Sequence, residues 1–284
     1  MLFRSEPARL FRLLGAGPWP AVSAAAAGAL LGTGKQAALR ALDVLIEANL
    51  VEARRADRFE LHDLLRLYAA EVASGELTPT ELDEAIGRLA EWCAHTAGGA
   101  RIALGTGHRF DLLGEPPSWL EPQQFASGKE AMAWLTIAWD SLLTIVQACA
   151  AHGQHRQVAV LTAMLWTYLD QLRVTTTESA ELHQLALRSA HEAGDDLVGA
   201  VLLNQLGTVY AMAGEFEDAS EKFAAAVPLF VAVGSRVGES MARENLGMEL
   251  GLLGKFDDGF VELEAAVALV DDGTDSIEIG RAHV

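Results

Sequence analysis

The chain has 284 residues, of which 51% are apolar, and this is enough for about two packed domains. Its formal net charge of −18 lies almost wholly beyond residue 75, where the chain has 31 acidic and only 12 basic side chains. Such a charge repels nucleic acid, which argues against a nucleic-acid surface in that part. Alanine and leucine dominate and β-branched runs are scarce, so the composition predicts a mainly α-helical protein with at most one small hairpin.

The two cysteines, Cys93 and Cys149, lie in apolar helical context, which predicts buried free thiols in a reducing compartment. No signal-peptide pattern opens the sequence. The most hydrophobic window, residues 131–152, is interrupted by Asp140 and Gln147, which favours a buried helix over a membrane span. We therefore expect a cytoplasmic protein.

Both chain ends match no structural pattern. Residues 2–5 and 279–284 can instead be read as one sequencing-library adapter translated from opposite DNA strands, because the reverse complement of codons for the first overlaps codons for the second. We therefore expect residues 1–5 and 279–284 to be adapter-derived and the natural protein to extend beyond both ends. The alternative is a natural terminus at each end.

Three short helices are predicted first, over residues 7–15, over residues 23–31, and between Gly34 and Asn49. Alternating apolar and polar residues then predict a hairpin over residues 50–61. Three helices followed by a hairpin are the plan of a winged helix, a helix-turn-helix with a β wing. We assign residues 6–76 to this domain.

The period changes from two to helical at His62, where Leu64, Leu65 and Tyr68 begin a new apolar face. His62 and Asp63 therefore lie at a strand-to-helix corner, and the Asp63 carboxylate is expected to cap the helix.

A DNA-binding winged helix places basic and amide side chains of its third helix in the major groove. Here that helix carries no net charge, and acidic side chains partly offset the arginines of the wing. Direct DNA binding is therefore not favoured, and a packing domain with a solvated wing is the preferred interpretation.

Residues 77–154 form a predicted helical spacer. An amphipathic helix is expected over residues 82–97, an extended connection with Trp119 and Phe125 over residues 98–127, and a long apolar helix over residues 131–152. So long a connection either packs across a neighbour through its aromatic side chains or is functional, and the sequence leaves both readings open.

Residues 155–278 are predicted to be repeats with a spacing of 40 residues, most clearly after residue 196. Gly207 should let two helices approach, Gly214 should end the first helix of the pair, and Phe216 and Phe223 should fill the core. The pattern resembles the tetratricopeptide repeat, with a period longer than usual. The resemblance implies a concave groove for a protein partner, lined by Val201, Asn204, Thr208, Met212, Glu244, Met248 and Leu252. The alternative is that these residues face solvent or another domain.

The Leu61-His62-Asp63 corner, followed by a spacer and repeats, resembles the C-terminal half of an NB-ARC-type STAND nucleotide switch, especially the actinobacterial antibiotic-regulatory activators. The resemblance covers residues 6–278. It implies that His62 contacts the diphosphate of ADP bound by a preceding ATPase module, and that Asp63 caps and orients the corner. Leu61 stands where the family has Met, and Ala138 where its spacer usually has Glu. ADP or ATP is expected in the full-length parent and no cofactor in this fragment.

We therefore expect a non-catalytic regulatory fragment, in which the winged helix locks a missing ATPase module in cis and the repeats bind a protein partner. The alternative is a stand-alone DNA-binding winged-helix regulator with a repeat-type sensor; for His62 it is an ordinary corner residue satisfied by backbone. No nucleophile, base and orienting group fall at a workable spacing, which argues against an enzyme. His152 and His155 lie about one helical turn apart, but they lack an evident third ligand, so no metal site is expected.

Overall fold

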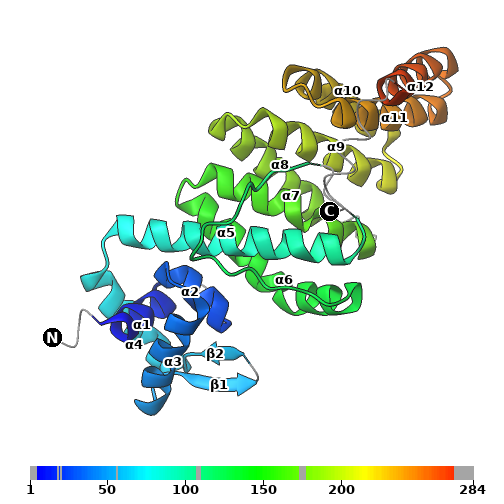
Figure 1. Cartoon of the computed structure of the whole chain (residues 1–284). Helices are drawn as coiled ribbons and strands as arrows, with labels where there is room; N and C mark the ends of the chain where they lie inside the picture. The colour runs from blue at the N-terminus through cyan, green and yellow to red at the C-terminus, as the bar shows by residue number, and fades with distance from the viewer. Residues whose placement is uncertain are drawn as a thin grey trace. The chain divides into compact units, whose positions relative to one another are not determined.

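The computed structural model describes residues 5–17, 19, 21–55, 57–106, 110–172 and 177–271 (Figure 1). Within these ranges the chain forms twelve α-helices and one two-stranded antiparallel hairpin. The predicted fold class, mainly α with one small hairpin ahead of a helical repeat array, is confirmed. The chain divides into two compact units, one of residues 1–105 and 113–157 and the other of residues 106–112 and 158–284.

The first unit begins with the predicted three helices and hairpin, which Figure 1 draws in blue. The bounds are α1 Glu6–Ala16, α2 Ala24–Leu31, α3 Lys35–Glu47, β1 Glu52–Arg55, β2 Arg58–Glu60 and α4 Asp63–Glu76. The Ser23 hydroxyl accepts a hydrogen bond from the Ala26 amide and starts α2, and Gly32 ends this helix with a φ of 72°. We call α1–α4 and the hairpin the helix-hairpin domain.

Backbone pairing joins the hairpin to the chain that precedes α2. Ala53 pairs with Phe59, and Val22 forms an isolated antiparallel bridge to Phe59 on its other side, with hydrogen bonds of 2.9 Å in both directions. Phe59 thus has partners on both sides, and its side chain is buried. Helix α4 packs on α1 at Gly15, where an added Cβ would lie 2.3 Å from the Cβ of Ala69. The small side chains therefore permit this close approach.

The spacer contains α5, Pro79–Ala103, and α6, Gly128–Ala151, joined by the connection, residues 104–127. A capping box of Thr78 and Glu81 starts α5. The predicted end of this helix at residue 97 was wrong, because α5 continues through Gly98 and Gly99 to Ala103. Gly99 lies beside the connection, where an added Cβ would meet the backbone oxygen of Gln123 at an ordinary contact distance of 3.5 Å.

The two compact units do not separate residues 6–76 from residues 77–154, so this predicted boundary stays a prediction. The predicted boundary between residues 154 and 155 lies close to the division after residue 157. Arg88 of α5 fastens the spacer to the helix-hairpin domain, because its guanidinium donates to the backbone oxygens of Ala29, at 3.1 Å, and Leu30, at 2.8 Å. Burial lowers the pKa of Arg88.

The second unit contains the repeats. Their helices are α7 His155–Leu172, which starts just before the division, α8 Thr177–Ala193, α9 Asp196–Ala213, α10 Phe216–Ala232, α11 Arg236–Leu252 and α12 Phe256–Asp271. From α8 to α12, each helix packs against the next one along the chain. The predicted helical hairpins are thus present.

Two glycines shape the hairpin of α9 and α10 as predicted, one by close helix contact and one by ending a helix. An added Cβ at Gly207 would lie 2.6 Å from the Phe223 ring, so α9 and α10 meet at this point only because the side chain is missing. Gly214 ends α9 with a φ of 83°. Phe223 is buried as predicted, whereas Phe216 is only half-buried.

Part of the connection belongs to the repeat unit. Residues 106–112 cluster with it, and the ring of Phe110 stacks on that of Phe230 in α10, with centroids 5.4 Å apart. The rest of the connection packs within the first unit, where the ring centroids of Phe125 and Trp134 of α6 are 5.6 Å apart. The connection thus packs through its aromatic side chains, as one of the two open interpretations expected, whereas the other, a functional connection, stays a prediction.

Among the described residues, α6 and α9 are long and apolar enough to cross a membrane by length and composition alone. Helix α6 packs on α5, and α9 packs on α8 and α10. Core helices of packed proteins pass the same test, so these two helices are weak evidence for a membrane protein.

Candidate functional site

The predicted nucleotide-reading corner lies where β2 ends and α4 begins. Leu61 is buried and anchors the turn, and His62 is the N-cap residue of α4, with an exposed side chain. The His62 Nε2 atom pairs with the Glu52 carboxylate of β1, across the hairpin. The imidazole is therefore held by one side-chain contact and remains accessible to a further ligand.

Contrary to the prediction, Asp63 is not the capping residue of α4. It is the first residue of the helix, and the N-cap position belongs to His62, whose side chain makes no capping hydrogen bond. The Asp63 carboxylate is exposed in the first turn, where a negative charge still interacts favourably with the helix dipole. The structure thus brings His62 and Asp63 together at one exposed corner, with His62 rather than Asp63 at the N-cap position.

An apolar stripe follows this corner on α4. Leu64, Leu67 and Tyr68 recur at helical spacing and all are exposed, Leu64 to 81%. The same helix buries Ala69 and Ala73 against α1. The stripe therefore is a second apolar face, beyond the one that builds the domain core, and it lies beside His62.

The predicted groove in the repeats is only partly present. Val201 and Asn204 of α9 are 3% and 7% exposed, so neither is available to a partner, and that part of the prediction was wrong. The Asn204 side-chain oxygen instead accepts a hydrogen bond of 3.0 Å from the Asn245 amide of α11. Neighbouring helices use this part of α9 for their own packing, which the repeat pattern alone did not reveal.

The remaining groove residues are accessible. Thr208 and Met212 of α9 are half-buried, and Glu244, Met248 and Leu252 of α11 are exposed, Met248 to 50% and Leu252 to 63%. Two of the three exposed residues on α11 are apolar. An accessible surface for a partner within the described residues is therefore centred on α11 rather than shared equally with α9.

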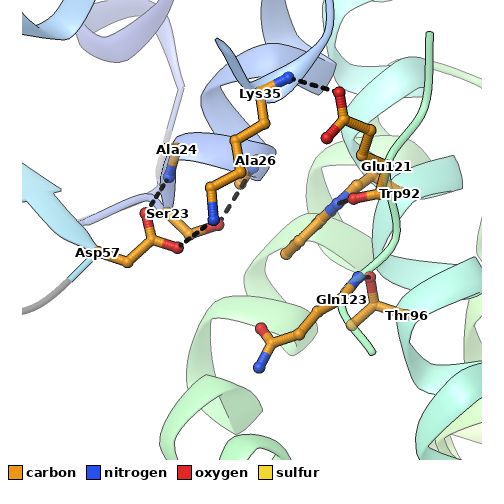
Figure 2. Close-up of polar contacts among 9 residues, drawn as sticks. All are labelled: Ser23, Ala24, Ala26, Lys35, Asp57, Trp92, Thr96, Glu121 and Gln123. Atoms are coloured by element: carbon orange, nitrogen blue, oxygen red, sulfur yellow. Dashed lines mark hydrogen bonds and ion pairs between the residues drawn. The ribbon is translucent and has the colours of Figure 1, made fainter. Parts of the chain in front are cut away.

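The N-terminus of α3, the end that would enter a DNA groove, is covered (Figure 2). The backbone amide of Lys35 donates to the Glu121 carboxylate of the connection, at 3.1 Å, and an added Cβ at Gly34 would lie 2.7 Å from the same oxygen. The Lys35 ammonium binds Asp57 of the hairpin, at 3.3 Å. The Glu121 carboxylate therefore occupies the hydrogen-bonding position at the start of α3, where a helix N-terminus favours an anion.

The connection is held to α5 beside this contact. The indole N–H of Trp92 donates to the Glu121 backbone oxygen at 2.9 Å, and the Gln123 amide donates to the Thr96 hydroxyl at 3.3 Å (Figure 2). These bonds position the Glu121 side chain toward α3. Sequence reasoning missed this role, because a single Glu in an irregular segment gives no pattern.

A cleft of about 850 Å³ lies in the same unit, between the hairpin side of the helix-hairpin domain and helices α5 and α6. Its lining includes Trp19, Trp92, Trp134 and Arg58. No motif of the sequence predicted it, because its walls come from segments distant along the chain.

The described residues contain no cluster of three or more potential metal-ligating His, Cys, Asp or Glu side chains. His152 binds Asp83 through Nδ1 at 2.6 Å. Cys93 and Cys149 are buried free thiols, as predicted, and burial raises the pKa of Cys149 to about 12. Neither thiol is therefore placed as a nucleophile.

The fold and the corner define a mainly helical protein with a helical repeat array behind a helix-hairpin domain. The chain is similar to the regulatory protein AfsR of Streptomyces griseus, with 29% identity over 272 residues, which is 94% of this chain and 28% of that protein. It is equally similar to AfsR of Streptomyces coelicolor, with 29% identity over 257 residues, or 86% of this chain and 25% of that protein. The chain thus spans about a quarter of the length of these regulatory relatives.

A solved STAND signal-transduction ATPase with a tetratricopeptide repeat sensor, from Pyrococcus horikoshii, superposes with a TM-score of 0.40 at 13% identity. The superposition covers 94% of this chain and 51% of that one. No family model matches the chain. The similarity to AfsR proteins agrees with the resemblance to the C-terminal half of such regulators that the corner and the repeats indicated.

Proposed function

We propose that this chain is the regulatory C-terminal part of a nucleotide-switched transcriptional or signalling regulator. In this proposal the helix-hairpin domain is a winged helix that holds an NB-ARC-type ATPase module in its closed state. The repeats bind a protein partner that controls the switch. The similarity to AfsR regulatory proteins over 94% of the chain supports the regulatory role.

The observation that carries the proposal is the exposed corner with its apolar stripe. A module that docks in cis needs an apolar contact face, and Leu64, Leu67 and Tyr68 offer one on α4. A phosphate-reading group must lie at the edge of that contact and be accessible, as His62 is. The two features adjoin each other because His62 directly precedes α4.

The chemistry of the corner suits the diphosphate of ADP. An imidazole donates a hydrogen bond to a phosphate oxygen, and does so more strongly when it is charged. The N-terminus of α4 adds a partial positive charge at the same place. Glu52 is the competitor, because its carboxylate already pairs with the imidazole and has to share it with an arriving phosphate or release it.

The proposal is tested in the parent protein that carries the nucleotide-binding module ahead of Glu6. The variant His62→Ala should weaken the binding of a fluorescent ADP analogue about tenfold, the loss expected for one hydrogen bond to a charged group. The matched control is His191→Ala, which removes an exposed histidine of α8. If both variants bind ADP as the parent does, His62 does not read the nucleotide.

Recovering the coding sequence upstream of Glu6 gives an independent test. The proposal expects a strand followed by a glycine-rich phosphate loop with Gly-Lys-Ser or Gly-Lys-Thr, and an acidic magnesium site after it. A reading frame without this motif would remove the ATPase module from the proposal and leave a winged-helix and repeat adaptor.

The proposed partner surface of the repeats is the accessible part of the groove, with Glu244, Met248 and Leu252 of α11 at its centre. Flexible apolar side chains beside a carboxylate suit a peptide that carries apolar and basic residues. Replacing Met248 and Leu252 by Ser should abolish pull-down of the cellular partner without changing the helical circular dichroism. The replacements Val231→Ser and Val267→Ser, on other exposed positions of α10 and α12, are the matched control.

The second candidate, a stand-alone DNA-binding regulator, is opposed by Glu121 and Asp57. Both carboxylates hold Lys35 at the start of α3, where a base-reading helix would need a free cationic end. Anisotropy of a labelled DNA duplex at low salt tests this point. Strong binding that falls steeply with salt would favour this second candidate. We further propose that the fragment is cytoplasmic, non-enzymatic and without a cofactor or metal of its own.

A further inference from the structure

The cleft in the first unit is large enough for a small organic molecule. Its volume of about 850 Å³ falls in the range of known ligand sites. Figure 2 shows two residues of one wall, Ser23 and Asp57, and two of the other, Trp92 and Gln123. The hairpin and the start of α2 thus form one side, and α5, α6 and the connection form the opposite side.

The side formed by α5 and α6 is mostly apolar. Leu89, Leu142 and Ile145 are buried at its base, and Trp134 stands edge-on to Trp92 with ring centroids 6.5 Å apart. The indole N–H of Trp92 is already satisfied by a backbone oxygen, so this ring offers the cleft only its apolar surface. Such a wall suits an aromatic or branched apolar group.

The hairpin side carries charge, most of which is paired. Arg54 binds Glu60, and Asp57 accepts hydrogen bonds from the Lys35 ammonium and from the Ala24 amide. Within the part of the chain that the structure describes, no carboxylate or carbonyl partner is found for the half-buried Arg58, although it lines the cleft. A guanidinium beside an apolar wall attracts an anion, because charge-assisted hydrogen bonds strengthen where water is partly excluded.

We propose that this cleft binds a small organic anion. Its aromatic or branched apolar body lies against Trp92 and Trp134, and its acidic group binds Arg58. A carboxylate, a sulfonate and a phosphate monoester share this chemistry. The site goes beyond the proposed nucleotide switch and does not depend on it, because every lining residue belongs to this chain. A molecule that touches both Arg58 of the hairpin and Trp134 of α6 stabilises the contact between the helix-hairpin domain and the spacer.

Two probes that share one aromatic skeleton test the proposal on the whole chain. Anilinonaphthalene sulfonate carries the anion, and N-phenylnaphthylamine lacks it. Energy transfer from Trp92 and Trp134 should excite either probe when it is in the cleft. The variant Arg58→Gln should bind the sulfonate about tenfold more weakly, as for one charge-assisted hydrogen bond, and the neutral probe unchanged. Arg40→Gln, on the exposed face of α3, should change neither affinity.

The replacement Ala138→Phe fills the cleft without touching charge, and should weaken both probes. It also separates the cleft from the exposed stripe on α4, where the probes could bind through apolar contact alone. If Ala138→Phe and Arg58→Gln both keep the parent's affinity for the sulfonate, the probe binds elsewhere and the proposal is wrong. If Arg58→Gln weakens both probes equally, the cleft does not select an anion.

Discussion

The contact between Gly207 and Phe223 gives the sharpest test of how the repeats are held together. The variant Gly207→Ala adds one methyl group, which would lie 2.6 Å from the nearest Phe223 ring carbon and 2.8 and 2.9 Å from two others. Ordinary contact between carbon atoms needs about 3.5 Å or more. The ring cannot simply turn away, because Phe223 is buried in a cluster with Ala219 and Leu246.

Two effects of opposite sign determine how much Gly207→Ala changes the free energy of unfolding. Alanine is a better helix former than glycine, which stabilises α9 by about 1 kcal/mol. Overpacking of a closed core costs about 1–3 kcal/mol. The net expectation is a loss of up to about 2 kcal/mol in the free energy of unfolding, with the packing cost outweighing the gain in helix propensity.

The assay is urea denaturation followed by circular dichroism at the helical band. Gly251→Ala is the matched control, because Gly251 lies in α11 with no atom within 4 Å of an added Cβ. It should stabilise the protein by about 0.5–1 kcal/mol through helix propensity alone. The double variant Gly207→Ala, Phe223→Leu should lose less than the sum of its two parts, because the smaller side chain leaves room for the methyl group. A Gly207→Ala protein as stable as Gly251→Ala would refute the reasoning.

Three further predictions concern buried or capping groups. Burial lowers the pKa of His183, so the unfolded chain binds a proton at a higher pH than the folded chain does. The free energy of unfolding should therefore fall as the pH drops below about 6.5. The variant His183→Gln should flatten this loss in urea titrations. Cys93 and Cys149 should stay unreactive toward a disulfide reagent at neutral pH until denaturant is added, because burial raises the pKa of both thiols; rapid labelling of the native protein would contradict their burial. Glu121→Ala should lower the thermal midpoint by removing a cap worth about 0.5–2 kcal/mol, whereas Glu115→Ala, in the same connection, should not.

The elements of the first unit were predictable because their signals are local. Ser23, Gly32 and the change of period at His62 mark helix and strand boundaries through the conformations that their own backbones favour. The extension of α5 beyond residue 97 was missed, because Gly98 and Gly99 resemble a helix stop in sequence. Tertiary packing decides otherwise, because Gly98 and the following Ala100 and Arg101 are buried as part of the continuing helix.

For the candidate sites too, the sequence predicted the local features and missed the contacts that depend on packing. His62 could be placed at a strand-to-helix corner from the sequence, but its partner Glu52 could not, because the pairing depends on the register of the hairpin. The repeat pattern located the helices that carry the groove. It could not show that Val201 and Asn204 are buried, because burial depends on how closely neighbouring helices pack.

The sequence by itself determined the helical class, the order of the elements and the spacing of 40 residues between repeats, because periodicity, caps and glycines act over a few residues. Only the tertiary structure decided what covers the start of α3, which side chains meet at the cleft, and that residues 106–112 belong to the repeat unit. Glu121 and Lys35 are 86 residues apart, and Arg58 and Trp134 likewise come from distant segments. Contacts of this kind depend on how whole helices and strands pack, and no short stretch of sequence predicts that packing.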